Sequence, residues 1–341
     1  MSTATAPAHD PLLDLRLARQ SPLRRVQHVL HSHPALSPTL VLLISVVVFG
    51  FLNTRFIRPE NLSLITQQVA VVGALAVGQT LIILTAGIDL SVGKLMLLAQ
   101  MVMAQTAVAH GVPPLVTLVL GVLFAGFASF LNGLLVTRLN LPPFIVTLGS
   151  LFVFGAITLL YSSGQTISNI PSLLTWTGTT FSLGSLNVTT GVILMLLIYV
   201  VVAYALRNTA WGRHVYATGD DVEAARLAGI STKRVLLSVY TVAGIIFGLA
   251  AWIFLGRNGS ADPNGLPTAN LDSITAVVIG GTSLFGGRGV LVGSLIGSLI
   301  VGVFRNGLFL AGVNIYYQDL AVGIMIIAAV AIDQWIRKVR A

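Results

Sequence analysis

The sequence predicts an all-α, polytopic membrane protein with about ten transmembrane helices. Of its 341 residues, 55% are hydrophobic and 9% are charged, whereas soluble domains average about 25% charged residues. Apolar runs of roughly 20 residues recur along the chain, and each is long enough to cross a hydrocarbon core about 30 Å thick. We therefore expect one transmembrane domain over residues 36–336, flanked by cytoplasmic tails at 1–35 and 337–341.

Ten apolar spans are separated by breaks rich in Gly, Pro, Asn or charged residues. The expected spans are 36–54, 64–86, 91–110, 114–136, 143–162, 188–206, 236–256, 272–285, 289–310 and 318–336. An even number of spans places both termini on the same side of the membrane. One charged side chain, Arg305, falls inside the ninth span. It should face protein or water unless a span boundary is misplaced.

The distribution of Lys and Arg predicts which side is cytoplasmic, because cytoplasmic loops carry the excess of these residues. With the N-terminus inside, all but four of the 19 Lys and Arg residues fall on the inner side. The exceptions are Arg55, Arg58, Arg257 and Arg305. Both termini and the loop 207–235 are therefore expected in the cytoplasm. The basic residues form no separate domain, so the net charge of +8 does not indicate a nucleic-acid partner.

An internal repeat is indicated by two segments that align without a gap at an offset of 174 residues. These are NGLLVTRLNL at 132–141 and NGLFLAGVNI at 306–315. In the expected topology, spans 2–5 and 7–10 then form two inverted repeats, which would place a transport pathway at their interface; a chance match of Gly-rich and Leu-rich spans is the alternative. Asn132 and Asn306 occupy equivalent positions, where each amide either bonds a neighbouring helix or lines a solute route.

The segment TAGIDLSVGK at 85–94 forms a polar break between two spans. It does not match a phosphate-binding loop, because five residues separate its glycines and Leu95 follows Lys94. The chain therefore shows no nucleotide site of its own, and no cofactor is expected. Asp89 and Ser91 either cap the third span or take part in a gate on the solute pathway, since a carboxylate at the edge of a span is costly without a partner.

A short amphipathic helix is predicted within the 207–235 loop, over DDVEAARLAGI at 220–230. Acidic residues open its first turn, and Gly229 is placed to end it. A helix this short is marginal in water, so we expect it to dock against another protein; an amphipathic linker lying on the lipid surface is the alternative. The residues expected to form this coupling contact are Glu223, Ala224, Ala225, Arg226, Leu227, Gly229 and Ile230.

The segment AVVIGGTSLFGGRGVLVGSLIGSL at 276–299 is rich in glycine at membrane depth. Its glycines either allow close helix packing or interrupt a short eighth span that lines the pathway. Polar uncharged residues within other spans are further candidates. The residues considered for a translocation pathway or gate are Asp89, Ser91, Asn132, Thr147, Gly280, Gly281 and Asn306.

Three stretches carry a family resemblance: GIDLSVG at 87–93, GRHVYATGDDVEAARLAGI at 212–230, and VIGGTSLFGGRG at 278–289. In this order they resemble the ribose-type permease subunits of bacterial ATP-binding-cassette importers, within the branched-chain and ribose permease superfamily. The resemblance extends over nearly all of residues 40–336. One departure is the acidic pair Asp220–Asp221, where the family would lead us to expect a more varied, often Asn-containing pair.

The resemblance implies a permease in the bacterial inner membrane that imports a monosaccharide such as ribose, xylose or fructose. It implies a separate cytoplasmic ATPase, with a cleft that receives the short helix of the 207–235 loop. It also implies a periplasmic sugar-binding protein and a second permease copy, which would make the membrane unit a homodimer. ATP hydrolysis would then belong to the partner ATPase, and the chain itself is not expected to be an enzyme.

A secondary transporter of a small polar solute, driven by an ion gradient, is the alternative, since inverted repeats suit it as well. Proton-driven transport usually requires acidic residues within the membrane. The acidic residues near span ends are only Asp89, Asp272, Asp319 and Asp333. A membrane enzyme is not indicated, because the histidines show no metal-ligand spacing and the chain has no cysteine.

Overall fold

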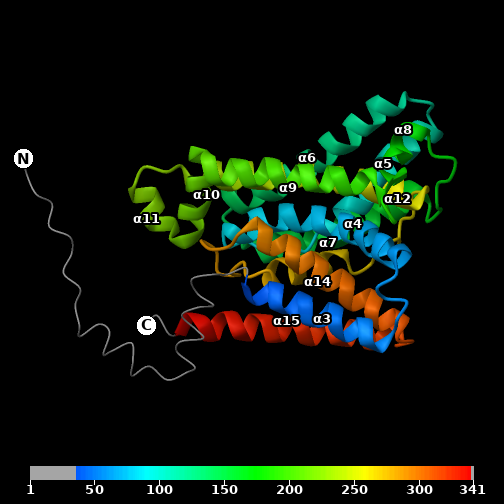
Figure 1. Ribbon diagram of the computed structural model, residues 1–341. Helices are drawn as coiled ribbons and strands as arrows, with labels where there is room; N and C mark the ends of the chain where they lie inside the picture. The colour runs from blue at the N-terminus through cyan, green and yellow to red at the C-terminus, as the bar shows by residue number, and fades with distance from the viewer. Residues whose placement is uncertain (1–35, 339–341) are drawn as a thin grey trace, which may run out of the picture.

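The computed structural model describes residues 36–338 as a bundle of long helices with one small β-hairpin (Figure 1). The first elements are α3 (Leu36–Leu52), α4 (Pro59–Leu84), α5 (Val92–Val108), α6 (Pro114–Arg138), α7 (Pro143–Ser162), α8 (Ser172–Thr175) and the 3-10 helix η1 (Trp176–Gly178). They are followed by β1 (Thr180–Leu183), β2 (Leu186–Thr189), α9 (Thr190–Asn208), α10 (Ala210–Asp220), α11 (Val222–Leu227), α12 (Thr232–Asn258), α13 (Ala269–Ile279), α14 (Leu291–Leu310) and α15 (Ile315–Lys338). The tail expected at 1–35 lies outside the described residues, as do residues 339–341 of the other tail.

Within the described residues, six helices are long and apolar enough to cross a membrane: α4, α6, α7, α9, α12 and α14. Four shorter apolar helical segments cover 37–52, 92–108, 269–279 and 315–328. Every predicted span overlaps one of these ten helical segments, and six of the ten reach the length and hydropathy of a full crossing within the residues described. The chain has the architecture of an all-α polytopic membrane protein.

Two features differ from the expected helical spans. The eighth span, expected over 272–285, ends as α13 at Ile279, and residues 280–290 form turns and extended backbone. In addition, β1 and β2 form an antiparallel hairpin in which Leu183 pairs with Leu186. Its two-residue turn begins at Gly184, whose positive φ of 64° suits a tight hairpin connection.

Helices α4 and α12 form the centre of the bundle and contact each other. α4 also packs against α13 and α14, whereas α12 packs against α5 and α6. Almost every residue of α4 from Val69 to Leu84 is buried, as expected for a helix that is apolar on all sides. Small residues allow the close contacts: Gly78 of α4 faces the ring of Phe247 in α12, and Gly244 of α12 faces the backbone of Ala125 in α6.

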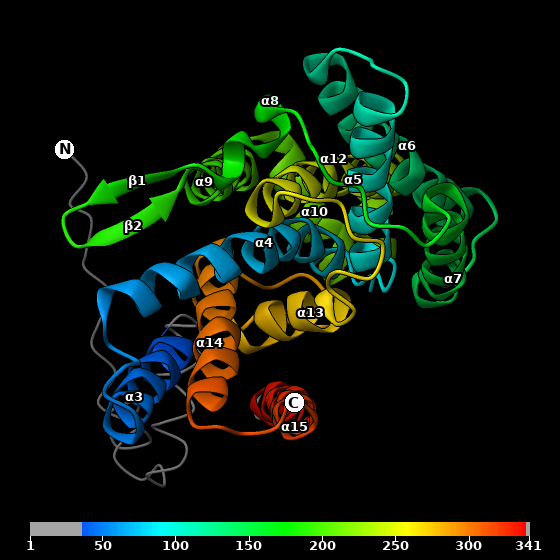
Figure 2. The ribbon, with the colours of Figure 1, turned by 90° about the vertical axis from the view of Figure 1, so that its right-hand side faces the viewer.

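The two ends of the bundle carry different extramembrane structures. Helices α10 and α11 project from one end, and α8 lies at the other (Figure 1). In Figure 2, which faces this second end, the hairpin extends outward from the start of α9. The arrangement follows from the chain order, because the single long helix α9 connects β2 to α10. Between the ends, the outer helices leave apolar side chains such as Ile44 and Phe152 exposed, at 61% and 69% of their accessible surface; this surface suits contact with lipid.

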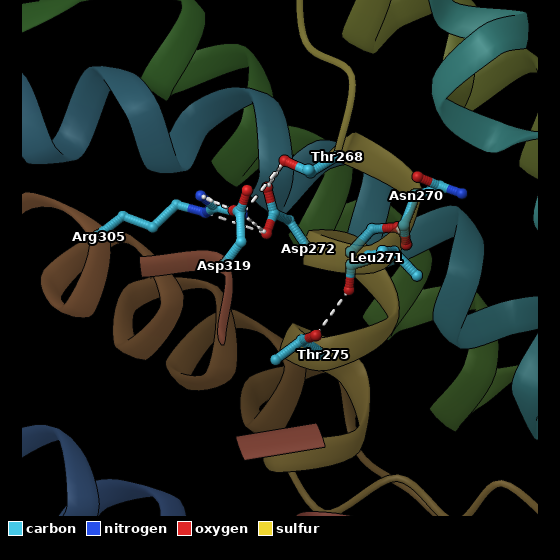
Figure 3. Close-up of polar contacts among 8 residues, drawn as sticks. Thr268, Asn270, Leu271, Asp272, Thr275, Arg305 and Asp319 are labelled. Carbon is cyan, nitrogen blue, oxygen red and sulfur yellow. Dashed lines mark hydrogen bonds and ion pairs between the residues drawn. The ribbon is translucent and has the colours of Figure 1, made fainter. Parts of the chain in front are cut away.

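Arg305 of α14 joins two neighbouring helices through an ionic cluster (Figure 3). Its Nη2 and Nε donate to Oδ1 of Asp272 in α13 at 2.7 and 3.1 Å, and its Nη1 donates to Oδ1 of Asp319 in α15 at 3.1 Å. Thr268 completes the cluster by donating to Oδ2 of Asp272 at 3.0 Å. The expectation that Arg305 faces protein is therefore confirmed, and the cluster fixes the start of the short helix α13.

The two carboxylates of this cluster should differ in their effect on stability. The Asp272 side chain is 3% exposed and that of Asp319 is 46% exposed. Because Asp272→Asn leaves the mostly buried guanidinium without its main partner, we expect it to cost about 3 kcal/mol, whereas Asp319→Asn should cost at most about 1 kcal/mol. Thermal unfolding of the detergent-solubilised protein measures both. Equal losses for the two variants would contradict the assignment of Asp272 as the principal partner.

Candidate functional site

The short helix α11 has a defined cap at each end. At its start, the Oδ1 atom of Asp221 accepts hydrogen bonds from the backbone N–H groups of Glu223 and Ala224, at 2.9 and 3.0 Å. At its end, Gly229 adopts a φ of 84°, and the N–H of Ile230 donates to the carbonyl of Ala225 at 3.0 Å. This is the hydrogen-bond pattern of a Schellman motif, which requires the left-handed backbone that glycine adopts readily.

α11 divides into an inner and an outer face. Ala225 is 4% exposed and Ile230 packs against the main core, so these two residues hold the helix in place. Leu227 is 84% exposed, and Glu223 and Arg226 form an exposed ion pair at 2.8 Å beside it. The predicted coupling residues are therefore brought together on one small element, which presents an apolar side chain and an ion pair outward.

Helix α10, which precedes α11, is not among the predicted elements. Thr209 caps it by accepting from the N–H of Gly212 at 3.2 Å, and Trp211 ties its first turn to α12 by donating Nε1–H to the Ser238 hydroxyl at 2.8 Å. Near its end, Tyr216 donates its hydroxyl to the carbonyl of Gly289 at 2.9 Å. The Thr209 cap could have been predicted from the local sequence. The contacts of Trp211 and Tyr216 could not, because they depend on residues distant in the chain.

The break between α4 and α5 is organised by Asp89. Its Oδ1 accepts from the N–H of Ser91 at 2.7 Å and from the Ser91 hydroxyl at 2.6 Å. Ser91 occupies the N-cap position of α5, but its own side chain makes no capping hydrogen bond. Asp89 therefore shapes the turn that enters α5, instead of either residue capping the helix in the usual way. Both side chains are fully buried.

Helices α6 and α7 add two polar side chains to this turn. The Asn132 amide of α6 donates to the Ser91 hydroxyl at 3.2 Å, and its oxygen accepts from the hydroxyl of Ser150 in α7 at 2.6 Å. Thr147 of α7 donates to the carbonyl of Ile88 at 3.0 Å. We call Asp89, Ser91, Asn132, Thr147 and Ser150 the buried polar network. It unites four of the seven candidate pathway residues.

The other three pathway candidates lie elsewhere. Asn306 of α14 pairs reciprocally with Asn61 near the start of α4, with two hydrogen bonds of 2.9 Å. Gly280 packs directly on the backbone of Gly293 in α14, and Gly281 forms the turn that follows α13, with φ 86°. At these positions the Asn306 amide joins two helices, and Gly280 and Gly281 permit close packing and a tight turn. Each residue therefore has the structural role that the sequence allowed as the alternative to a role in the pathway.

Sequence reasoning missed some of the polar groups around the break. Ser150 had one usable signal, since it stands three residues after Thr147 and so shares a helix face with it. Gln79 of α4 was already one of the polar uncharged candidates within the spans. Oriented to satisfy both groups, its amide bonds the carbonyl and N–H of Asp89 at 3.2 and 3.3 Å. The buried hydroxyl of Tyr240 in α12 also lies near the Asp89 turn, beside Gly87.

The chain matches one family model over most of its length. This model describes the branched-chain amino acid transport system permease component, and it matches residues 61–330. The protein therefore belongs to this family of permease subunits. The family resemblance carried by the three sequence stretches is confirmed.

Several curated relatives are similar over nearly their whole length. The fructose import permease protein FrcC of Rhizobium meliloti is 47% identical, covering 99% of this chain and 93% of the relative. The ribose import permease protein RbsC of Bacillus subtilis is 40% identical, covering 88% and 92%. The D-allose transport system permease protein AlsC of Escherichia coli is 35% identical, covering 87% and 91%. No solved structure matches the chain.

The hydrogen bonds of Asn132 predict a mainly structural role. Asn132→Leu leaves the Ser150 hydroxyl without its partner across the α6–α7 contact, and we expect a loss of stability of about 1–3 kcal/mol. Asn264→Leu is the control, because the exposed Asn264 amide makes no hydrogen bond among the described residues. Thermal unfolding of both variants gives the comparison. A fully stable Asn132→Leu protein that transports slowly would instead assign the amide to a solute route.

Proposed function

We propose that the chain is the membrane-spanning permease subunit of an ATP-binding-cassette importer that moves a monosaccharide into the cell. The observation that carries this proposal is the 47% identity to a fructose import permease across 99% of the chain. Relatives named for ribose and D-allose extend the substrate class to small neutral sugars, with pentoses such as xylose included by chemical likeness. Transport is the role of this subunit, and ATP hydrolysis belongs to a separate one.

The cytoplasmic ATPase is proposed to dock on α11. This helix is capped at both ends, and it presents Leu227 and the ion pair of Glu223 and Arg226 to solvent. An exposed apolar residue on an extramembrane helix suits a small protein interface, since burying a leucine contributes about 1.5–3 kcal/mol. A periplasmic sugar-binding protein would meet the other end of the bundle, where α8 and the hairpin lie, and a second permease copy would complete a homodimer.

The proposed topology has ten spans, with both termini and α10–α11 in the cytoplasm. The helix order supports two inverted repeats, because α4–α7 and α12–α15 each consist of a long buried helix, a shorter one and two further helices. Packing also supports them: α4 contacts α13 and α14 of the other half, while α12 contacts α5 and α6. Such interlocking is expected when two copies of one motif are related by a pseudo-twofold axis.

The buried polar network is proposed to hold the break at 85–91 in one shape beside the solute route. Apart from Asp89 Oδ2, which is buried without a partner among the described residues, its polar groups bond one another and the backbone of the break, so the network acts as a fixed part of a gate. Asn306, Gly280 and Gly281 are proposed to support the helices around that route. An ion-driven transporter is less well supported, because Asp272 and Asp319 are both paired with Arg305 and Asp89 is bonded to Ser91.

Reconstitution tests the proposal directly. Proteoliposomes containing the permease and its ATPase, supplied with the binding protein, should take up labelled fructose or ribose only when ATP is present. An uptake that follows an imposed proton or sodium gradient without ATP would contradict the importer assignment and favour the secondary transporter.

The docking role of α11 has its own prediction. Leu227→Glu should lower the affinity of the permease for its ATPase by about tenfold or more, which corresponds to the lost burial of one leucine side chain. Leu183→Glu is the matched control, since Leu183 is 61% exposed in the hairpin at the opposite end. Co-purification with the ATPase measures the effect for both variants. Unchanged ATPase binding by Leu227→Glu would exclude α11 as the docking element.

A further inference from the structure

A glycine-rich loop, residues 280–290, lies between the end of α10 and the break at 85–91. It follows the short helix α13 and precedes α14. The loop is closed on itself by a hydrogen bond from the N–H of Ser283 to the carbonyl of Arg288 at 2.9 Å. Its shape is therefore defined by its own backbone, and it can act as one compact piece.

On one side, the loop contacts the end of α10. The Tyr216 hydroxyl donates to the carbonyl of Gly289 at 2.9 Å. Burial raises the pKa of Tyr216, so its hydroxyl stays protonated and available as a donor. Further along α10, a Cβ atom on Gly287 would lie 2.7 Å from the Cα of Asp220, so the two backbones are in direct contact there.

On its other side, the same loop contacts the end of α4 and the first residues of the break. The N–H of Gly287 donates to the carbonyl of Leu84 at 3.0 Å. A Cβ atom on Gly286 would lie 2.8 Å from the backbone nitrogen of Ala86 and 2.6 Å from the carbonyl oxygen of Gly219 in α10. Three backbones therefore meet at one place: the end of α10, the glycine-rich loop and the start of the break.

The position of these contacts on α10 gives them a mechanical consequence. Trp211 ties the first turn of α10 to α12, whereas Tyr216 and Gly219 lie in the half that leads directly into α11. A displacement of α11 therefore reaches the glycine-rich loop through the last turns of α10, which also touch the carbonyl of Leu84 at the end of α4. Apart from the Tyr216 hydrogen bond, these contacts are between backbones, so little of the displacement passing through them can be absorbed by rotamer changes.

We propose that Tyr216 and the glycine-rich loop are positioning elements that transmit the displacement of the docked α10–α11 segment to the break at 85–91. The inference rests on the proposed function and adds a physical connection within it. The break continues directly into Asp89 and the buried polar network, so the loop joins the ATPase-facing surface to the buried part of the protein. It also assigns a role to the glycines at 280–290 other than lining the solute route.

The test compares coupling, measured as sugar imported per ATP hydrolysed by the reconstituted complex with its binding protein. Tyr216→Phe removes the hydrogen bond to Gly289 and keeps the ring. We expect the coupling ratio to fall about fivefold, the equivalent of one hydrogen bond. Gly287→Ala places a methyl group against the Asp220 backbone, and should lower the ratio at least as far.

Matched controls separate transmission from general damage. Tyr204→Phe makes the same chemical change at a tyrosine that is 65% exposed on α9. Gly312→Ala imposes the same backbone strain, since Gly312 has a φ of 74° against 70° for Gly287, but a Cβ there meets nothing within 4 Å. Both controls should keep the coupling ratio of the unaltered complex. A folding defect lowers import and hydrolysis together, and so leaves the ratio unchanged.

Two outcomes would overturn the inference in distinguishable ways. If the unaltered complex imports sugar with ATP but Tyr216→Phe and Gly287→Ala keep its coupling ratio, the glycine-rich loop does not transmit the displacement and the proposed function stands. If the unaltered complex shows no ATP-dependent import of fructose or ribose, the proposed function fails and this inference fails with it.

Discussion

The constraint on which this structure depends is that backbone groups at membrane depth have no water to bond and must find partners in the protein. Regular helices meet this requirement internally. The break at 85–91 does not, and its backbone is satisfied by neighbouring elements: the carbonyl of Leu84 accepts from Gly287, and that of Ile88 accepts from Thr147. The helices and the loop around the break are therefore held close by hydrogen bonds as well as by apolar packing.

The same constraint explains which features the sequence could predict. Helical spans depend on local composition, so their positions follow from hydropathy, and α11 depends on local capping, so its end at Gly229 was predictable. The hairpin was not predicted, although its Gly-Ser turn between Thr-containing strands is a local signal. It was overlooked because the prevailing pattern of the chain is helical.

Contacts between distant residues were beyond prediction for a physical reason. The sequence indicates that Arg305 and Asn132 need partners, because a buried charge or amide is costly alone. It does not indicate that Asp272 and Ser91 supply them, since those pairings arise only when four separate helices are packed. Close helix contacts at small residues were unpredictable for the same reason. Gly78 of α4 meets the ring of Phe247 in α12, and no local sequence pattern indicates where these two helices cross.

The polar interior restricts how the proteins of this fold can move. Opening the break at 85–91 by local unfolding would separate Asp89 from Ser91 and Asn132 from Ser150 within the buried interior, at about 1–3 kcal/mol for each group left unpaired. A rigid displacement of the break together with the ends of its helices keeps these bonds intact and costs less. Movement of helices as units is therefore favoured over rearrangement of the break itself. Elements that contact the break from outside through backbone groups are then well placed to control its position.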